Sequence, residues 1–265
     1  MRIQILGTAA AEGWPAVFCG CDTCVRARAA GGHNLRSRSS IQIDDIYKID
    51  LPPDTFHHVL TYDINLSNLE HLFITHSHHD HFAVSELYYT RPPFAHNIRK
   101  PPIRIYGNET VADTVRTKVS EDSHPIEVVT LEAFVPVKAN DLRFIPITAH
   151  HSPNEHCLNY VIESDSVRVL YASDTGEYEQ PTLDFLAALD YDLLIIECTQ
   201  GALPGPATSH MSFEAVLRLR DKIGPTTRTV ITHFSHNMGL LHDEFEAIAN
   251  PEGVEVAYDG IVLEC

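Results

Sequence analysis

The chain has 265 residues, of which 44% are hydrophobic, and 36 Asp and Glu against 19 Lys and Arg give it a formal net charge of −17. This hydrophobic fraction excludes a disordered, collagen-like or coiled-coil protein and is typical of a globular chain with a sizeable core. The acidity argues against nucleic acid as a partner, because proteins that bind nucleic acid usually carry a basic face. It leaves room for a small anionic substrate held by bound cations.

The sequence carries no sign of a membrane segment. No stretch approaches the ~20 apolar residues of a membrane span, and the start, MRIQILGTAAAEG, has no apolar core like that of a signal peptide. We therefore expect a cytoplasmic protein without a membrane partner, in which cysteines stay reduced. The sequence does not exclude a homodimer.

Short apolar runs alternate with amphipathic ones along the chain. Their mixed order predicts sheets covered by helices in one integrated domain spanning residues 1–265. Ser212 is a candidate N-cap for the third predicted helix. The predicted strands are Arg2–Leu6, Ser39–Ile43, Ile46–Ile49, Leu72–Thr75, Ile103–Tyr106, Leu142–Thr148, Leu158–Glu163, Val167–Ala172, Leu193–Ile196, Thr229–Thr232 and Val254–Ala257; the predicted helices are Asn108–Val119, Leu183–Leu189, Phe213–Ile223 and Leu241–Ala249.

A histidine-rich segment directly follows the predicted strand Leu72–Thr75. It reads His76-Ser77-His78-His79-Asp80-His81, and imidazole together with carboxylate suits Zn, Mn or Fe. His76 and His78 can point the same way in extended chain. Asp80 and His81 are adjacent and would point apart, so the spacing alone suggests that they serve two neighbouring metals.

The pattern His76-x-His78-x-Asp80-His81 resembles the HxHxDH signature of the metallo-β-lactamase superfamily. The resemblance implies an α/β fold of the four-layer αββα sandwich type and two divalent metal ions, zinc or manganese, bridged by a hydroxide. It implies that His76, His78 and His151 bind one ion, that Asp80, His81 and His233 bind the other, and that Asp174 bridges them.

For one ligand of this set, the sequence offers three candidate histidines. His150 and His151 alternate faces at the end of a predicted strand, and His156 is a third option. We favour His151 because the family often has His-Ser at this point.

A second cluster of metal-ligand type precedes the histidine segment. Cys19, Cys21 and Cys24 form C-x-C-x-x-C, and three thiolates within six residues can occupy three corners of a tetrahedron. His236 stands three residues after His233 and can reach the other way as the fourth ligand. The spacing predicts a closed structural zinc site.

Together these features resemble the phosphoribosyl cyclic phosphodiesterase (PhnP) family of the carbon–phosphorus lyase pathway. The resemblance rests on Leu6-Gly7-Thr8, the CxCxxC run, Arg38-Ser39-Ser40, HxHxDH and the closing His-x-x-His. It implies hydrolysis of a small cyclic or nucleotide-like phosphodiester. It assigns His210 as proton donor or phosphate-oxygen stabiliser, and it makes Asp80 a ligand on which turnover depends.

Two other functions compete with this one. The first is a nuclease resembling the tRNA 3′-processing enzymes, against which the charge of −17 argues. The second is a non-catalytic accessory or carrier protein resembling PqqB, in which the dinuclear site is incomplete. About one metal per chain, held by thiolates, would favour the accessory protein over an enzyme with three.

Overall fold

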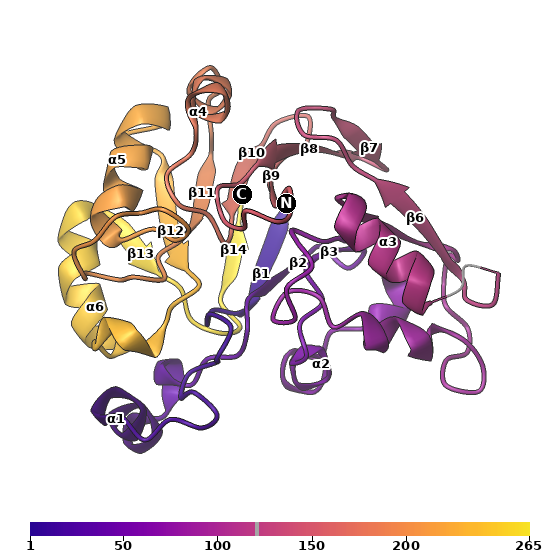
Figure 1. Cartoon of the computed structure of the whole chain (residues 1–265), viewed down its shortest axis with the longest axis horizontal. Coiled ribbons are helices and arrows are strands. Elements are labelled where there is room, and N and C mark those ends of the chain that lie inside the picture. Colours follow the sequence, from indigo (N-terminus) through magenta and orange to yellow (C-terminus); the bar gives the residue numbers. More distant parts are fainter. Residues whose placement is uncertain (120–121) are drawn as a thin grey trace.

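Two seven-stranded sheets pack face to face, and helices cover their outer faces (Figure 1). The computed structural model describes residues 1–119 and 122–265. The arrangement is the expected αββα sandwich. Among the described residues, no helix combines the length and the apolar character needed to cross a membrane.

The first sheet contains the N-terminal strands and the last strand of the chain. Its strands β3 to β6 run parallel to one another, so their carboxyl ends lie at the same edge. Helices α2 (Thr55–Tyr62) and α3 (Glu109–Lys118) lie on its side of the sandwich. In order across the sheet, the strands are β14 (Val262–Glu264), β1 (Arg2–Gly7), β2 (Ser40–Ile43), β3 (Tyr47–Ile49), β4 (His71–Phe73), β5 (Ile103–Gly107) and β6 (Ile126–Thr130).

The second sheet is built from the middle and later parts of the chain. Strands β10 to β13 are parallel, and β8 and β10 are both antiparallel to β9, so β8 runs in the same direction as β10. Helices α4 (Gln180–Ala187), α5 (Phe213–Ile223) and α6 (His242–Ala249) cover it (Figure 1). In order, the strands are β13 (Val254–Val256), β12 (Arg228–Thr232), β11 (Leu193–Glu197), β10 (Arg168–Ala172), β9 (Leu158–Glu163), β8 (Leu142–Thr148) and β7 (Val137–Ala139).

The main core lies between the two sheets, and stacked aromatic rings cross it. The ring of Phe73 lies 3.8 Å from that of Phe144 in the second sheet and 4.3 Å from that of Tyr106 in its own. All three side chains are buried. Phe73 ends β4, so this packing fixes the point from which the histidine segment leaves the sheet.

The predicted strands and helices are present, with ends displaced by at most three residues. The cap of the third predicted helix is also confirmed, because Ser212 accepts a hydrogen bond from Ala215 N at 3.3 Å. Among the described residues, two α-helices and three strands were not predicted: α1 (Asp22–Ala30), α2, β6, β7 and β14. Helix α1 buries Thr23, Cys24 and Ala27, which are too small to give the sequence an apolar stripe.

Candidate metal centre

The carboxyl ends of five strands bring the candidate residues to one edge of the sandwich. In the first sheet, β4 leads into the histidine segment. In the second sheet, β8, β10, β11 and β12 run in the same direction, so the residues that end or follow them meet at the same edge. These residues are His151, Asp174, Glu197 and His233.

The histidine segment forms a tight turn rather than an extended strand. The backbone N–H of His81 donates to the carbonyl of His78 at 3.0 Å, and the N–H of Phe82 donates to the same carbonyl at 2.8 Å. This turn brings Asp80 Oδ2 to 3.2 Å from His81 Nε2. The expectation that Asp80 and His81 would point apart is therefore wrong, because it assumed extended backbone.

The first cluster contains His76, His78, His151 and Asp174, each offering one ligand atom within 4.8 Å of the others. His151 Nε2 lies 3.1 Å from His78 Nδ1. Asp174 Oδ2 lies 3.4 Å from both His76 Nε2 and His151 Nε2. The histidines come from both sheets, so this cluster crosses the seam of the sandwich.

The second cluster contains Asp80, His81, Asp174 and His233 within the same limit. Asp174 Oδ1 lies 2.6 Å from His233 Nε2, and Asp174 Oδ2 lies 3.3 Å from His81 Nε2. Asp174 thus belongs to both clusters, and its carboxylate lies between them. This is the position that the resemblance implied for it.

The chemistry of the second cluster fits a cation. Asp50 Oδ2 lies 2.7 Å from His81 Nδ1. An ionised carboxylate only accepts hydrogen bonds, so Nδ1 carries a proton, and Nε2 is the nitrogen that faces the cluster and can bind a cation. His233 Nε2 faces the same point at 3.3 Å. Two imidazole nitrogens and two carboxylates that converge in this way favour a bound cation between them.

The spacing of the ligand atoms also fits a bound metal ion. Nitrogen and oxygen ligands about 2.0–2.1 Å from a tetrahedral ion lie roughly 3.3 Å from one another. Six of the separations within the two clusters lie between 3.1 and 3.4 Å. Among the described residues, the buried Nε2 of His76 has no hydrogen-bond partner, as expected of an atom reserved for a metal.

Burial and the nearby carboxylates act in opposite directions on the histidines. Burial lowers the pKa of His76 well below its usual value, which favours the neutral form that binds metals. Burial also disfavours protonation of His81, but the carboxylates of Asp174, Asp80 and Asp50 outweigh it and raise its pKa. A cation bound here would replace that proton, so metal binding releases it.

Three residues of the centre have left-handed backbone. The φ angles are 63° at Asp50, 50° at Asp174 and 59° at His233. Asp and His adopt this region more readily than bulky residues, although it remains uncommon outside glycine. Each residue lies just after its strand, where the turn directs the side chain back over the edge of the sheet.

The neighbouring histidines of the β8–β9 loop differ in direction. His151 lies in the first cluster, where its Nδ1 is 3.1 Å from the carbonyl of Ser209. His150 turns away, with its Nδ1 3.1 Å from the carbonyl of Glu177. His156 is exposed and lies outside both clusters. Geometry therefore favours His151 of the three options.

His210 lies beside both clusters and is partly exposed. Its ring centroid is 4.9 Å from that of His151 and 5.8 Å from that of His233. Its Nδ1 lies 2.8 Å from Glu197 Oε1. Burial opposes protonation, but the hydrogen bond and charge of Glu197 outweigh it and raise the pKa of His210 to about 9.

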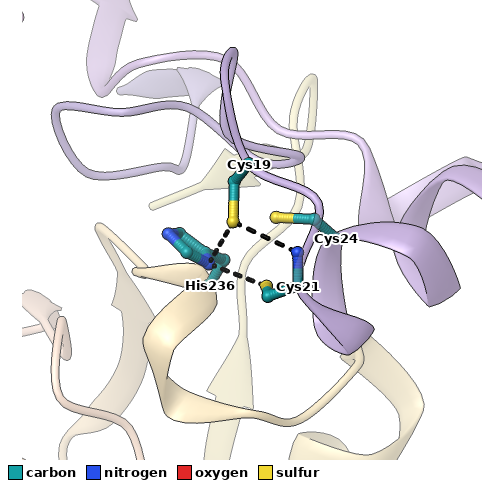
Figure 2. A group of neighbouring side chains, drawn as sticks. All are labelled: Cys19, Cys21, Cys24 and His236. Atoms are coloured by element: carbon teal, nitrogen blue, oxygen red, sulfur yellow. Dashed lines mark hydrogen bonds between the residues drawn. The ribbon is translucent and has the colours of Figure 1, made fainter.

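The cysteine segment and His236 form a separate cluster (Figure 2). Cys19 and Cys21 precede α1, Cys24 lies in its first turn, and His236 begins the short 3-10 helix His236–Met238. His236 Nδ1 lies 3.4 Å from Cys21 Sγ and 3.9 Å from Cys19 Sγ. All six cysteines of the chain are free thiols.

These distances suit a tetrahedral ion bound by three thiolates and an imidazole. Hydrogen bonds from the backbone of Cys24 and from Cys19 and His236 lower the pKa of Cys21 to about 6. Burial raises the pKa of Cys24 to about 11, so a cation is needed to hold this residue as a thiolate. The cluster connects the N-terminal loop to the segment that carries His233.

The sequence analysis missed three supporting residues. Asp50 orients His81. Glu197 is fully buried, and Thr199 Oγ1 donates to its Oε2 at 2.6 Å while lying 2.8 Å from His233 Nδ1. The available signal was a carboxylate at the end of an apolar strand, as in Leu193–Glu197.

Comparison with known protein families assigns the chain to a superfamily. The family model described as "Beta-lactamase superfamily domain" matches residues 53–234, which include both histidine clusters. The chain belongs to this superfamily. Cys19, Cys21, Cys24 and His236 lie outside the matched range. A search of curated protein sequences finds no match.

Solved structures share the fold along the whole chain. A diphosphatase of the PhnP family has a TM-score of 0.80 at 22% identity, covering 100% of this chain and 97% of that one. Zinc-bound PqqB from Methylobacterium extorquens has a TM-score of 0.79 at 17% identity, covering 100% of both. The short form of human tRNase Z has a TM-score of 0.66 at 16% identity, covering 100% and 99%. The superfamily, the fold and the two clusters identify the protein as a metal-dependent hydrolase of metallo-β-lactamase type.

Proposed function

We propose that the protein is a phosphodiesterase that hydrolyses a small cyclic or nucleotide-like phosphodiester. The observation that carries the proposal is the place of His210, whose ring lies beside His151 and His233 while its Nδ1 is 2.8 Å from the buried carboxylate of Glu197. A phosphodiester offers two sites for such a group: the non-bridging oxygens and the leaving oxygen.

The residues of the two clusters would hold two divalent cations. His76, His78 and His151 would bind one, Asp80, His81 and His233 would bind the other, and Asp174 would bind both. When bound, such a pair lowers the pKa of water and polarises phosphoryl oxygens. Imidazole and carboxylate ligands suit zinc or manganese. We assign a structural zinc to Cys19, Cys21, Cys24 and His236.

His210 supplies the acid. Its raised pKa of about 9 keeps the ring protonated at neutral pH. Nδ1 is engaged with Glu197 Oε1, which leaves Nε2–H to donate to an oxygen of the substrate. Donation to the leaving oxygen avoids expulsion of a free alkoxide, and donation to a non-bridging oxygen stabilises its developing charge. Thr199 Oγ1, 3.2 Å from His210 Nδ1, further restricts the ring.

Charge favours a small substrate over a polynucleotide. The net charge of −17 repels a long polyanion, whereas one phosphodiester needs only the local charge of the centre. The structural similarity to a PhnP-family diphosphatase agrees with chemistry at phosphorus. The similarity to human tRNase Z keeps transfer RNA in the test as a competing substrate.

The test uses full-length protein loaded with zinc or manganese. It is assayed against bis-p-nitrophenyl phosphate, a panel of cyclic ribose phosphates and nucleotides, and transfer RNA with a 3′ extension. We expect turnover of bis-p-nitrophenyl phosphate and of at least one cyclic diester, and no cleavage of the RNA. Metal content should be close to three ions per chain.

His151→Ala and His150→Ala form a matched pair, because the two residues are adjacent and only His151 lies in the cluster. We expect the first variant to lose turnover and the second to keep it. No turnover of any diester at any metal loading would refute the proposal. In that case one thiolate-bound metal per chain would identify an accessory protein like PqqB.

A further inference from the structure

A carboxylate outside the two metal clusters connects the loops that form the first of them. Glu155 lies in the β8–β9 loop, four residues after His151. Its Oε1 accepts hydrogen bonds from Ser77 N at 2.8 Å and from Asn108 Nδ2 at 2.8 Å. Its Oε2 accepts one from Ser77 Oγ at 2.6 Å. Three donors therefore converge on one side chain.

These donors belong to segments that are distant in the sequence. Ser77 stands between His76 and His78, so its backbone position sets where both imidazoles begin. Asn108 is the N-cap of α3, where its Oδ1 accepts from Val111 N at 2.9 Å. Asn108 Nδ2 also donates to the backbone carbonyl of His156, the residue after Glu155, at 2.9 Å. The carboxylate thus joins the histidine turn of the first sheet to the His151 loop of the second.

Within the first cluster, His78 depends most on such support. In the second cluster, Asp50 bonds the ring of His81, and Thr199 Oγ1 lies 2.8 Å from the Nδ1 of His233. In the first cluster, His76 Nδ1 likewise lies 3.0 Å from Thr75 Oγ1, and His151 Nδ1 lies 3.1 Å from the carbonyl of Ser209. His78, in contrast, is exposed, so packing does not fix it. A metal that binds unbraced loops must order them on binding, which lowers its affinity.

We propose that Glu155 is a positioning residue that holds His78 and His151 ready for one of the two cations. Through Ser77 it fixes the histidine turn, and through its own loop it fixes His151. The inference rests on the dinuclear centre of the proposed function. It does not depend on the phosphodiesterase reaction, because its readout is metal binding.

The experiment compares Glu155→Ala with Glu155→Gln in the full-length chain after chelator treatment. Stepwise dissociation constants for Zn²⁺ are measured by competition with a chromophoric chelator. We expect Glu155→Ala to weaken one of the two ions of the histidine centre about tenfold, as is usual when groups that support metal ligands are lost. The other ion should stay within twofold of wild type.

Glu155→Gln should keep that ion within threefold of wild type. The amide oxygen can accept from Ser77 N and Asn108, and the amide NH₂ can donate to the Ser77 hydroxyl, which also accepts. His156→Ala is the matched control, since it changes the exposed side chain next in sequence and keeps the backbone carbonyl. It should bind both ions like wild type.

Three results would overturn the inference: wild-type zinc affinities in Glu155→Ala, equal weakening of both ions, or a Gln variant as weak as the Ala variant. If Glu155→Ala does not fold, the inference is tested with Ser77→Ala instead. That variant removes one of the three hydrogen bonds and keeps the backbone donor, so it should weaken the same ion two- to fivefold. Unchanged affinity in Ser77→Ala would then refute the proposal. Zinc affinity and diester turnover test the two proposals separately. Weaker binding of one zinc ion in Glu155→Ala supports this inference even if the wild-type protein hydrolyses no diester. Unchanged zinc affinity in Glu155→Ala refutes this inference even if the wild-type protein is a phosphodiesterase.

Discussion

The role of His210 can be tested by replacing it with Gln, which keeps a polar side chain but cannot carry a proton at neutral pH. A pKa of about 9 means that about 99% of the wild-type side chain is protonated at pH 7, against about a quarter for an ordinary histidine with a pKa of 6.5. Loss of a general acid typically lowers kcat by about 10²- to 10⁴-fold, and Gln keeps an N–H donor but has no proton to transfer. We expect a loss of this size in His210→Gln.

The pH profile shows which protonation state of His210 is the active one. Activity requires protonated His210, so wild-type kcat/KM should hold through neutral pH and fall as pH rises through the pKa of the ring. Bound cations lower that pKa, because like charges repel, so the alkaline limb lies at or below about pH 9. The variant should lack this limb. The assay is kcat/KM against pH at saturating, fixed metal concentration.

The leaving group separates the two ways in which His210 can act. p-Nitrophenolate leaves without a proton, whereas a sugar alkoxide needs one. If His210 protonates the leaving oxygen, His210→Gln should lose more activity against a cyclic ribose phosphate than against bis-p-nitrophenyl phosphate. Equal losses indicate stabilisation of the non-bridging oxygens. Activity within threefold of wild type, with the alkaline limb intact, would refute both roles.

Three further predictions concern the metals. Asp80→Ala should abolish turnover with little change in the urea midpoint of unfolding and should remove one ion, as counted by plasma emission; full activity would show that the centre is wrongly assigned. Cys21→Ser should lose the structural ion and lower the melting temperature before it affects chemistry, so normal melting with three bound ions would contradict the thiolate site. Asp50→Asn should weaken one zinc ion by about 10- to 100-fold, because His81 loses the carboxylate that fixes its tautomer; unchanged zinc affinity in a competition titration would argue against that support.

The sequence predicted best where polar ligands follow apolar strands. His76 and Asp174 each follow shortly after such a run, and the resemblance to the superfamily implied that they share one metal centre. The structure supplies the physical reason, because strands that run in the same direction bring their carboxyl ends to one edge. Their roles as ligands remain predictions until metal content is measured. The fold class was likewise visible in the alternation of strands and helices.

Other features depend on turns and long-range contacts that no local pattern reveals. Asp80 and His81 converge because the chain turns after His78, and adjacent residues give no sign of this. Glu155 looks like any acidic loop residue until Ser77 is seen to donate to it from 78 positions away. Helix α1 escaped prediction because its buried side chains are small.

The division of the metal ligands between the two sheets has a consequence for split versions of the protein. A fragment ending before β7 would carry His76, His78, Asp80 and His81, and the remainder would carry His151, Asp174 and His233. Neither fragment contains a complete set for either ion. If separately expressed halves were mixed, zinc should favour their reassembly, and a chelator should release them again.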